Sequence, residues 1–375
     1  MASASSAQFD PRIHVGVGAE RVTHVSSTDY PGVYPDDDHA WDLARFKQRL
    51  AVAVKRLSNR SIEFDIVGVD ASIANSLRRV LIAEVPSVAI EFVYVWNNTS
   101  VMADEVFAHR LGLVPLNVDP ALMESKETPS AQATDRNTLV FKLRVACTRK
   151  PPPLRRAPPP PDAVFPGADD DELYEHAAVR ARDLLWVPQG EQEVVFARAH
   201  PAPTNGDIVL VKLRPGQEIE LEAHAIKGVG MDHAKFSPVA TASYRLLPHI
   251  ALNPSNPIPP RLADKFASCF APGVIRVDPR TKAVSVDPRA VRSDTVSREV
   301  LRHPEFEGCV QLARVRDHFI FNVETESAYE PQRLPFEAIR IMRHKIATLR
   351  AAAAALLAGT GADAEAGGDV QMAGT

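Results

Sequence analysis

The chain has 375 residues, with 43 Lys or Arg against 47 Asp or Glu and a formal net charge of −4. This length allows two domains with tails, and the charge argues against a large nucleic-acid footprint of its own. Three widely spaced cysteines, Cys147, Cys269 and Cys309, are typical of a reducing compartment. No signal-peptide pattern is found, and no apolar run reaches the ~18 residues of a membrane span. We therefore expect a soluble, intracellular protein without membrane contact.

The first elements in chain order are an arm and a hairpin. Residues 1–40 are rich in Ser, Asp and Pro without a hydrophobic period, which predicts a flexible, mostly extended arm. From Trp41 the pattern changes. Apolar residues alternate at 52–54 and 62–66, on either side of the turn-forming residues 58–60, which predicts a β-hairpin.

A short amphipathic helix is predicted over residues 70–85. Its apolar residues recur at spacings of three and four, and Asp70 or Ser72 can cap its start. Pro86 ends it, because a residue that precedes proline is disfavoured in the α region. The helix also carries three side chains that can donate hydrogen bonds, namely Asn75, Arg78 and Arg79. From the pattern alone, this is a core helix with solvated arginines or a helix that also binds a partner.

The middle of the chain reads mainly as strands. Strands are predicted over 90–96 and 139–145, and a helix over 102–111. The prolines in 150–172 predict a stiff surface loop, because proline cannot donate to a strand ladder. Ordered apolar segments return further along, at 183–188, 194–196, 208–213 and 219–223.

One segment has a partial phosphate-loop pattern. Gly228, Gly230 and Lys235 suggest such a loop, but the Gly-Lys-Ser/Thr ending and the strand-loop-helix frame are missing. The sequence has no nucleophile elbow and no Cys-x-x-Cys pair, and its histidines lack ligand spacing. A stand-alone phosphate-handling enzyme is therefore only a remote alternative.

A final helix is predicted from about Pro335 to Gly359, followed by a disordered tail. Its apolar residues alternate at spacings of three and four, which gives a heptad-like seam. The seam consists of Ile339, Met342, Ile346, Leu349, Ala353 and Leu356. It suits the domain's own core or a partner helix.

Two segments together carry a family resemblance. Asn75-Ser-Leu-Arg-Arg-Val-Leu-Ile-Ala-Glu-Val-Pro86 and Asp104-Glu-Val-Phe-Ala-His-Arg-Leu-Gly-Leu-Val-Pro-Leu116 resemble the paired signature of the alpha-like subunits of cellular RNA polymerases. Residues 212–220 and 228–247 resemble the stretch where this family leaves its inserted domain. The resemblance covers about residues 41–350. It implies an α+β fold, with a discontinuous dimerisation domain (a sheet plus two helices) and an inserted mostly-β domain.

The resemblance also implies domain boundaries. A flexible arm is expected at 1–40, the first segment of the dimerisation domain at 41–88 and the inserted domain at 89–240. The second segment of the dimerisation domain is expected at 241–350, and the helix end with a disordered tail at 351–375. A small subdomain at about 255–314 is expected to be metal-free, because Cys269 and Cys309 cannot supply the clustered thiolates of an iron–sulfur cluster. Residues 119–138 lack the cysteines of the zinc loop in the RNA polymerase II counterpart.

Residues 294–302 and 314–324 resemble the version of this subunit shared by RNA polymerases I and III. That resemblance implies a non-catalytic assembly subunit without cofactor or metal. It would heterodimerise with a smaller alpha-like subunit, and the second-largest, largest and small shared subunits would assemble on the pair. DNA would be contacted only indirectly. An archaeal-type or RNA polymerase II-type subunit is the nearer alternative.

The resemblance places the protein in the nucleus, in the nucleolus for polymerase I and the nucleoplasm for polymerase III, for rRNA, tRNA and 5S rRNA transcription. Leu77 is expected in the core or the dimer seam, while Arg78 and Arg79 are expected to reach toward the large subunits. The full set of expected partner-interface residues is Asn75, Leu77, Arg78, Arg79, Ile339, Met342, Ile346 and Leu349.

Overall fold

The computed structural model describes residues 9–25, 40–126, 128, 131–150, 173–326 and 329–366. The expected Pro-rich loop lies almost wholly outside these residues, as does the tail beyond residue 366. The chain forms two compact units. The first draws its described residues from 1–57, 62–78 and 243–322, and the second from 58–61, 79–242 and 323–375. The sequence-based domain boundaries stay a prediction.

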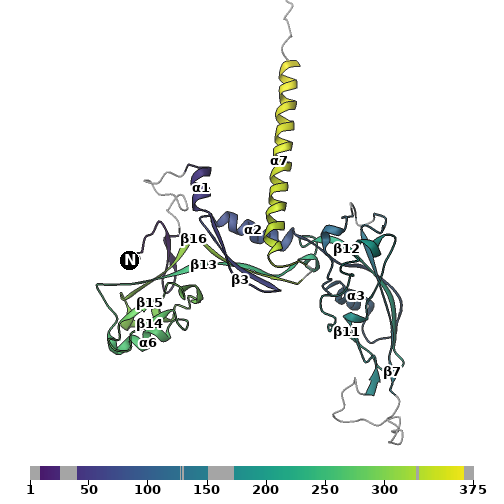
Figure 1. Ribbon diagram of the computed structural model, residues 1–375, viewed down its shortest axis with the longest axis horizontal. Helices are drawn as coiled ribbons and strands as arrows, with labels where there is room; N and C mark the ends of the chain where they lie inside the picture. Colours follow the sequence, from purple (N-terminus) through teal and green to yellow (C-terminus); the bar gives the residue numbers. More distant parts are fainter. Residues whose placement is uncertain are drawn as a thin grey trace, which may run out of the picture. The chain divides into compact units, whose positions relative to one another are not determined.

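The first unit contains most of a six-stranded sheet with the order β2-β1-β16-β4-β3, in which β13 also pairs with β16. Figure 1 labels β3, β13 and β16 of this sheet. The strands β13 and β16 extend a few residues into the second unit. The strands are β1 (His14–Val17), β2 (Val22–Thr23), β3 (Ala51–Leu57), β4 (Ser61–Val67), β13 (Val239–Leu252) and β16 (Val310–Thr325).

The prediction that all of residues 1–40 form a flexible arm is wrong over the strands β1 and β2. β1 pairs antiparallel with β16, with His14 opposite Val315, and β2 pairs with β1. The His14 ring also stacks on His249, with ring centroids 4.1 Å apart. A four-residue strand is too short to give a periodic signal, and its partner strand lies about 300 residues later in the sequence.

The predicted hairpin and the helix after it are confirmed. β3 and β4 pair antiparallel, with Leu57 opposite Ile62 at the turn. The helix α2 (Ala71–Ala83) begins after Asp70, whose Oδ1 accepts a hydrogen bond from the Ser72 amide at 2.8 Å. A helix that was not predicted, α1 (Leu43–Arg49), precedes the hairpin and begins at Asp42, whose side chain accepts from the Ala44 amide.

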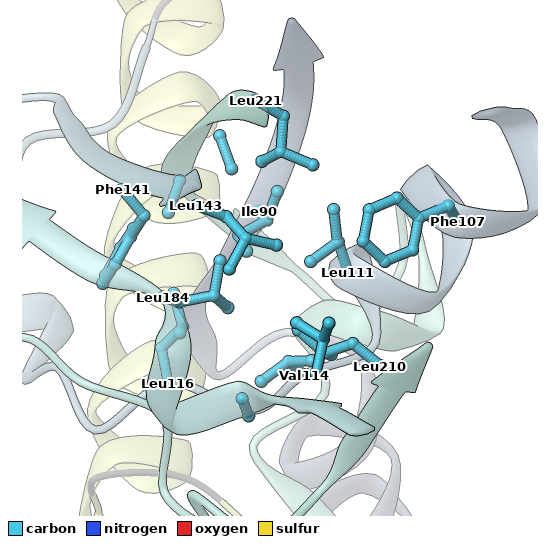
Figure 2. Close-up of a cluster of buried hydrophobic side chains, with 14 of the residues drawn as sticks. Ile90, Phe107, Leu111, Val114, Leu116, Phe141, Leu143, Leu184, Leu210 and Leu221 are labelled. Atoms are coloured by element: carbon cyan, nitrogen blue, oxygen red, sulfur yellow. The ribbon is translucent and has the colours of Figure 1, made fainter. Parts of the chain in front are cut away.

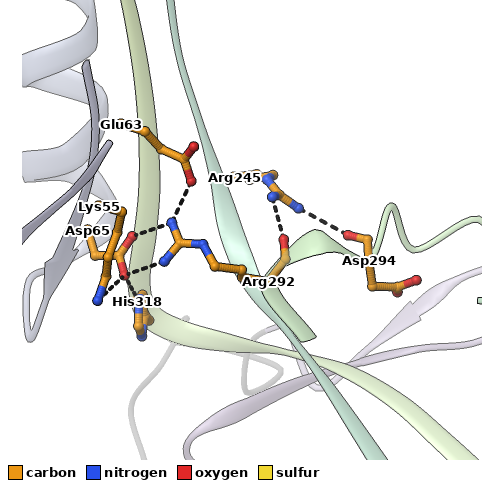
Figure 3. A network of polar contacts seen from close by, with 7 residues as sticks. All are labelled: Lys55, Glu63, Asp65, Arg245, Arg292, Asp294 and His318. Carbon is orange, nitrogen blue, oxygen red and sulfur yellow. Dashed lines mark hydrogen bonds and ion pairs between the residues drawn. The ribbon is translucent and has the colours of Figure 1, made fainter. Parts of the chain in front are cut away.

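Residues near 291–294 are held to the sheet by a network of charges (Figure 3). Arg292 donates to both carboxylate oxygens of Asp65 on β4, at 3.2 and 3.1 Å, and also to Glu63. From β13, Arg245 donates to the backbone carbonyl oxygens of Arg292 and Asp294. The network therefore joins the small subdomain to two strands of the sheet.

The small subdomain has its own core, in which Phe266, Val274 and Phe306 are buried. Cys269 and Cys309 are free, buried thiols, and burial raises the pKa of Cys269. Within the described part of the chain, no group of three or more His, Cys, Asp or Glu side chains could hold a metal ion. The subdomain elements are α6 (Ala263–Ser268), β14 (Ile275–Val277), β15 (Val284–Val286) and the 3₁₀ helices Pro260–Leu262, Val291–Ser293, Glu299–Arg302 and Pro304–Phe306.

The second unit contains a four-stranded sheet with the order β10-β6-β12-β5 and two two-stranded sheets, β11-β9 and β7-β8. Its strands are β5 (Pro86–Asn98), β6 (Thr138–Ala146), β7 (Thr148–Arg149), β8 (Tyr174–Glu175), β9 (Ala178–Arg180), β10 (Leu185–Val187), β11 (Val209–Lys212) and β12 (Glu218–Val229). Its helices are α3 (Asp104–Gly112), α5 (Gln192–Val195), α7 (Arg333–Ala366) and the 3₁₀ helices Pro120–Leu122, Ala181–Asp183 and Ala234–Phe236.

One face of the four-stranded sheet builds the core of this unit (Figure 2). β12 lies between β5 and β6, and its Leu221 is opposite Val95 and Leu143. Phe107 and Leu111, four residues apart on α3, are fully buried in the same core. The strands predicted over 90–96 and 139–145 and the helix over 102–111 are confirmed. The apolar period matches the covered face on β6, but on β5 Tyr94 and Trp96 are exposed and Val93 and Val95 pack against the core.

The helix α7 is a single helix of 34 residues (Figure 1). The prediction that it ends at Gly359 is wrong, since it continues to Ala366. A glycine inside a helix costs only about 1 kcal/mol relative to alanine. The alanine-rich sequence around Gly359 favours helix strongly enough to continue through it.

Candidate protein interface

The helix α7 exposes a row of apolar side chains. Ile346 and Leu349, both predicted as partner contacts, are 55% and 70% exposed. Ile339 is also exposed, whereas Met342 is half-buried. Leu334 and Ala338, near the start of the helix, are fully buried. The helix therefore packs into its own unit through its first turns and leaves the rest of the seam uncovered.

This row is longer than the predicted seam. Phe336, one turn before Ile339, is exposed, and so is Leu357 next to the predicted Leu356. Phe336 could have been found from its spacing of three to Ile339. We call the exposed row the α7 stripe, which consists of Phe336, Ile339, Ile346, Leu349, Leu356 and Leu357.

The apolar side of α2 is used within the chain itself. Leu77, Val80 and Leu81 are buried. Of the two places expected for Leu77, the core or the dimer seam, the core agrees with this burial. On the polar side, the Asn75 Oδ1 accepts from the Nε and Nη2 of Arg78, at 3.1 and 2.8 Å. This pair of hydrogen bonds orients the Arg78 guanidinium, while Arg79 is exposed. Contact of these residues with a partner stays a prediction.

A second exposed apolar row, not predicted from the sequence, lies on β3. Val52, Val54 and Leu57 are all exposed. They lie opposite Ile66, Phe64 and Ile62 of β4, which are buried. Opposite residues of an antiparallel pair share one face of a sheet, so the apolar face of β4 continues uncovered onto this edge strand. The alternation predicted the strand, but no local signal tells which strand of a sheet is left uncovered.

The comparisons with known proteins identify the family. The family model of the RNA polymerase Rpb3/Rpb11 dimerisation domain matches residues 63–346. This chain belongs to that dimerisation family. The matched range contains α2, β16 and the first turns of α7, including Phe336 and Ile339, whereas Leu349, Leu356, Leu357 and the exposed row on β3 lie outside it.

Several similar relatives are DNA-directed RNA polymerases I and III subunits RPAC1. The protein of Saccharomyces cerevisiae is 48% identical, over 90% of this chain and 97% of the relative. The proteins of Mus musculus and Homo sapiens are each 44% identical, over 92% of this chain and 96% of the relative. The resemblance and the α+β fold class inferred from the sequence are thereby confirmed. Membership of a polymerase dimerisation family also supports a structural role.

In this member of the family, the partial phosphate-loop residues are engaged in packing. A Cβ at Gly230 would lie 2.3 Å from the Ile82 carbonyl oxygen, and one at Gly228 would lie 2.8 Å from the Phe236 ring. The Lys235 ammonium donates to the Ile90 carbonyl oxygen at 2.9 Å and pairs with Glu91. The two glycines allow packed segments to approach each other closely. This packing explains the glycines without a bound phosphate.

No helix among the described residues is long and apolar enough to span a bilayer.

Proposed function

We propose that this chain is an assembly subunit of DNA-directed RNA polymerases I and III, which heterodimerises with a smaller alpha-like subunit. Two observations support the proposal. The RPAC1 relatives, whose names assign them to these two polymerases, are 44–48% identical over nearly their whole length. The α7 stripe leaves a heptad-spaced apolar row uncovered on a chain of a dimerisation family. The proposed heterodimer rests mainly on the α7 stripe.

In this proposal the α7 stripe packs against a helix of the smaller subunit. Apolar residues repeating at three and four suit such packing, because each side chain enters a gap on the facing helix. Interfaces of permanent complexes commonly bury more than about 2,000 Å² and are apolar at their centre. The exposed β3 row is a separate apolar surface on the other unit.

The assembled pair would then bind the second-largest and the largest polymerase subunits, together with small shared subunits. Arg78 and Arg79 are the side chains proposed for this contact, since a guanidinium binds carboxylates and backbone carbonyls bidentately. The proposed role is non-catalytic, and DNA is contacted only through the assembled enzyme. Its location follows as the nucleus, with the nucleolus for polymerase I and the nucleoplasm for polymerase III.

The test is affinity purification of the full chain from its own cells, with mass spectrometry of the proteins that bind. We expect a small alpha-like subunit and the large subunits of both polymerases. Ile346→Asp should lose the small subunit, because it would bury an unpaired charge in the interface. His344→Asp, an exposed residue of α7 outside the stripe, is the matched control and should bind normally. If both variants capture the small subunit equally, α7 is not the interface.

The same purification tests the arginines. Arg78→Ala should keep the small subunit but recover less of the second-largest subunit, because an oriented guanidinium is lost. Arg302→Ala, a side chain 76% exposed in the small subdomain, is the control. Normal recovery of the second-largest subunit by Arg78→Ala would refute this assignment.

A further inference from the structure

The first turns of α7 carry a balanced group of charges, which we call the α7 base cluster: Asp119, Lys227, Arg333 and Glu337. Arg333 donates from both terminal nitrogens to Asp119, at 2.7 and 3.2 Å, and from its Nε to Glu337 at 3.1 Å. Lys227 on β12 donates to the Met123 carbonyl oxygen at 3.0 Å. Two cations and two anions therefore meet where α7 begins.

These charges link α7 to the part of the chain that contains the four-stranded sheet. Asp119 caps the 3₁₀ helix Pro120–Leu122, where its side chain accepts from the Ala121 amide at 2.9 Å. The carboxylate is thus held by a contact that does not involve Arg333. Arg333 also lies over the ring of the buried Tyr329, with its Cζ 5.0 Å from the centroid. A bidentate pair between two fixed groups restricts direction as well as distance.

Among the described residues, the buried side chains that also hold α7 lie in its first turns. Leu334 and Ala338 are buried at its start, and the Lys345 ammonium pairs with the Glu84 carboxylate at 2.8 and 3.0 Å. From residue 343 to 357 every side chain is exposed. The described part of the helix therefore depends on its first three to four turns for its direction.

A small tilt at the base moves the interface by a large amount. Leu349 follows Arg333 by 16 residues, which is about 24 Å at 1.5 Å rise per residue. A tilt of about 10° at Arg333 would displace Leu349 by about 4 Å over this length. Such a displacement is close to the radius of an apolar side chain, so the α7 stripe would no longer match a rigid partner.

We propose that Asp119 and Arg333 are positioning residues for the partner interface: their bidentate pair fixes the direction of α7 and so presents the α7 stripe to the smaller alpha-like subunit. This inference rests on the proposed function of the stripe. Neither residue belongs to the stripe, and Asp119 lies 214 residues before its partner. The segment after α3 thereby acts on a contact made by the C-terminal helix.

The experiment measures two quantities separately on the full chain, the direction of α7 and the affinity for the small subunit. Spin labels are placed at Val101→Cys and Arg350→Cys, two exposed positions of the same unit, and their distance distribution is measured by pulsed electron paramagnetic resonance. The affinity for the purified small subunit is measured on the same variants without labels. Asp119→Asn should broaden the distance distribution and weaken binding about tenfold, within the usual range of coupling between sites.

Three further variants make the result specific. Asp119→Glu, which keeps the carboxylate, should give a narrower distribution and a higher affinity than Asp119→Asn. Arg333→Lys keeps the charge but cannot form the bidentate pair. Its distance distribution and its affinity should fall between those of the wild type and Asp119→Asn. Glu124→Gln, in an exposed pair with Arg136 at 3.7 Å, should change neither quantity.

An unchanged distance distribution or an unchanged affinity in Asp119→Asn overturns the inference. If Asp119→Asn fails to fold, Arg333→Lys answers the same question, and wild-type values for it in either measurement overturn the inference equally. Failure of the proposed function is a different result. In that case Ile346→Asp, which lies in the stripe itself, would bind the small subunit as tightly as the wild type.

Discussion

Asp65 is a buried carboxylate next to two cations, Arg292 and Lys55, and the imidazole of His318. Its side chain is 5% exposed, and it lies within 3.2 Å of Arg292, 3.2 Å of His318 and 3.7 Å of Lys55. Arg292 also binds Glu63, so this guanidinium joins the small subdomain to two carboxylates of β4. Removing one partner of a buried pair is costly, because the remaining charge stays away from water.

Arg292→Met should therefore destabilise the fold. We expect a loss of about 2 kcal/mol in the free energy of unfolding, below the 3–5 kcal/mol of a fully buried pair, because the Arg292 side chain is 23% exposed. Urea unfolding of the full chain measures the effect. Arg302→Met, at an exposed i,i+3 pair, should change the free energy by less than about 0.5 kcal/mol. Equal losses of unfolding free energy in Arg292→Met and Arg302→Met would show that burial of the Arg292 pair contributes nothing to stability.

At this scale, sequence patterns predict the apolar residues better than the polar ones. Phe64 and Ile66 were predicted as one face of a strand and are buried, but Asp65 between them is buried too. Alternation predicts that Asp65 faces solvent. It is covered because Arg292, 227 residues later, is brought against the other face of the strand. No local pattern contains that information.

Helix α2 is capped at its start by Asp70. The Asp70 side chain accepts from the Ser72 amide, and its backbone carbonyl oxygen accepts from the Ala74 amide. The hydrogen bonds from Ser72 hold the pKa of Asp70 below its ordinary value of 3.8. Since the folded-state pKa is lowered, this contribution is fully present above the unfolded-state pKa and is lost as the pH falls through the folded-state value.

Asp70→Ala should lower the free energy of unfolding by about 1 kcal/mol at neutral pH, whereas Asp70→Asn should cost only a few tenths, because asparagine caps nearly as well. Denaturation of both variants between pH 7 and pH 3 measures this. The free energy by which the wild type is more stable than Asp70→Ala should shrink as the pH falls below 3.8. The free energy by which Asp70→Asn is more stable than Asp70→Ala should not change with pH. A pH-independent advantage of the wild type would contradict an ionised cap.

The elements were predictable where one period extends over several turns or residues. The hairpin, α2 and β6 follow their periods, and their ends coincide with turn residues or proline. The periodic pattern also predicted the heptad-like seam of α7. It could not predict that Leu334 and Ala338 are covered while Ile346 and Leu349 are not, because coverage depends on the neighbours that the fold supplies.

At the scale of the whole molecule, the family resemblance predicted the α+β fold class, which periodicity alone could not. The fold brings β1 to β16 and Asp119 to Arg333, pairs that lie hundreds of residues apart, whereas residues 1–40 were predicted as a flexible arm. Such contacts follow from topology, and no single-sequence pattern indicates them. The discontinuous dimerisation domain and the interface helix that the resemblance implied stay predictions, and the resemblance did not distinguish the buried side chains of α7 from the exposed ones.

Without its partner, the full chain should self-associate through the α7 stripe. Apolar patches larger than a few hundred Å² are rare on monomeric proteins, and each Å² removed from water stabilises a complex by about 25 cal/mol. Sedimentation velocity of the purified chain at micromolar concentrations should show dimers or larger species. Added salt should not dissociate them, because it screens charges and leaves apolar contacts intact.

Ile346→Asp should shift the same sample toward monomer, since the new carboxylate would have to lose its water on association. His344→Asp adds the same charge two residues away, outside the stripe, and should leave the self-association unchanged. Addition of the smaller alpha-like subunit should replace the self-associated species by a 1:1 heterodimer. The prediction is wrong if the wild-type chain alone is monomeric at every concentration tested. The α7 stripe would then be too weakly apolar to drive association by itself.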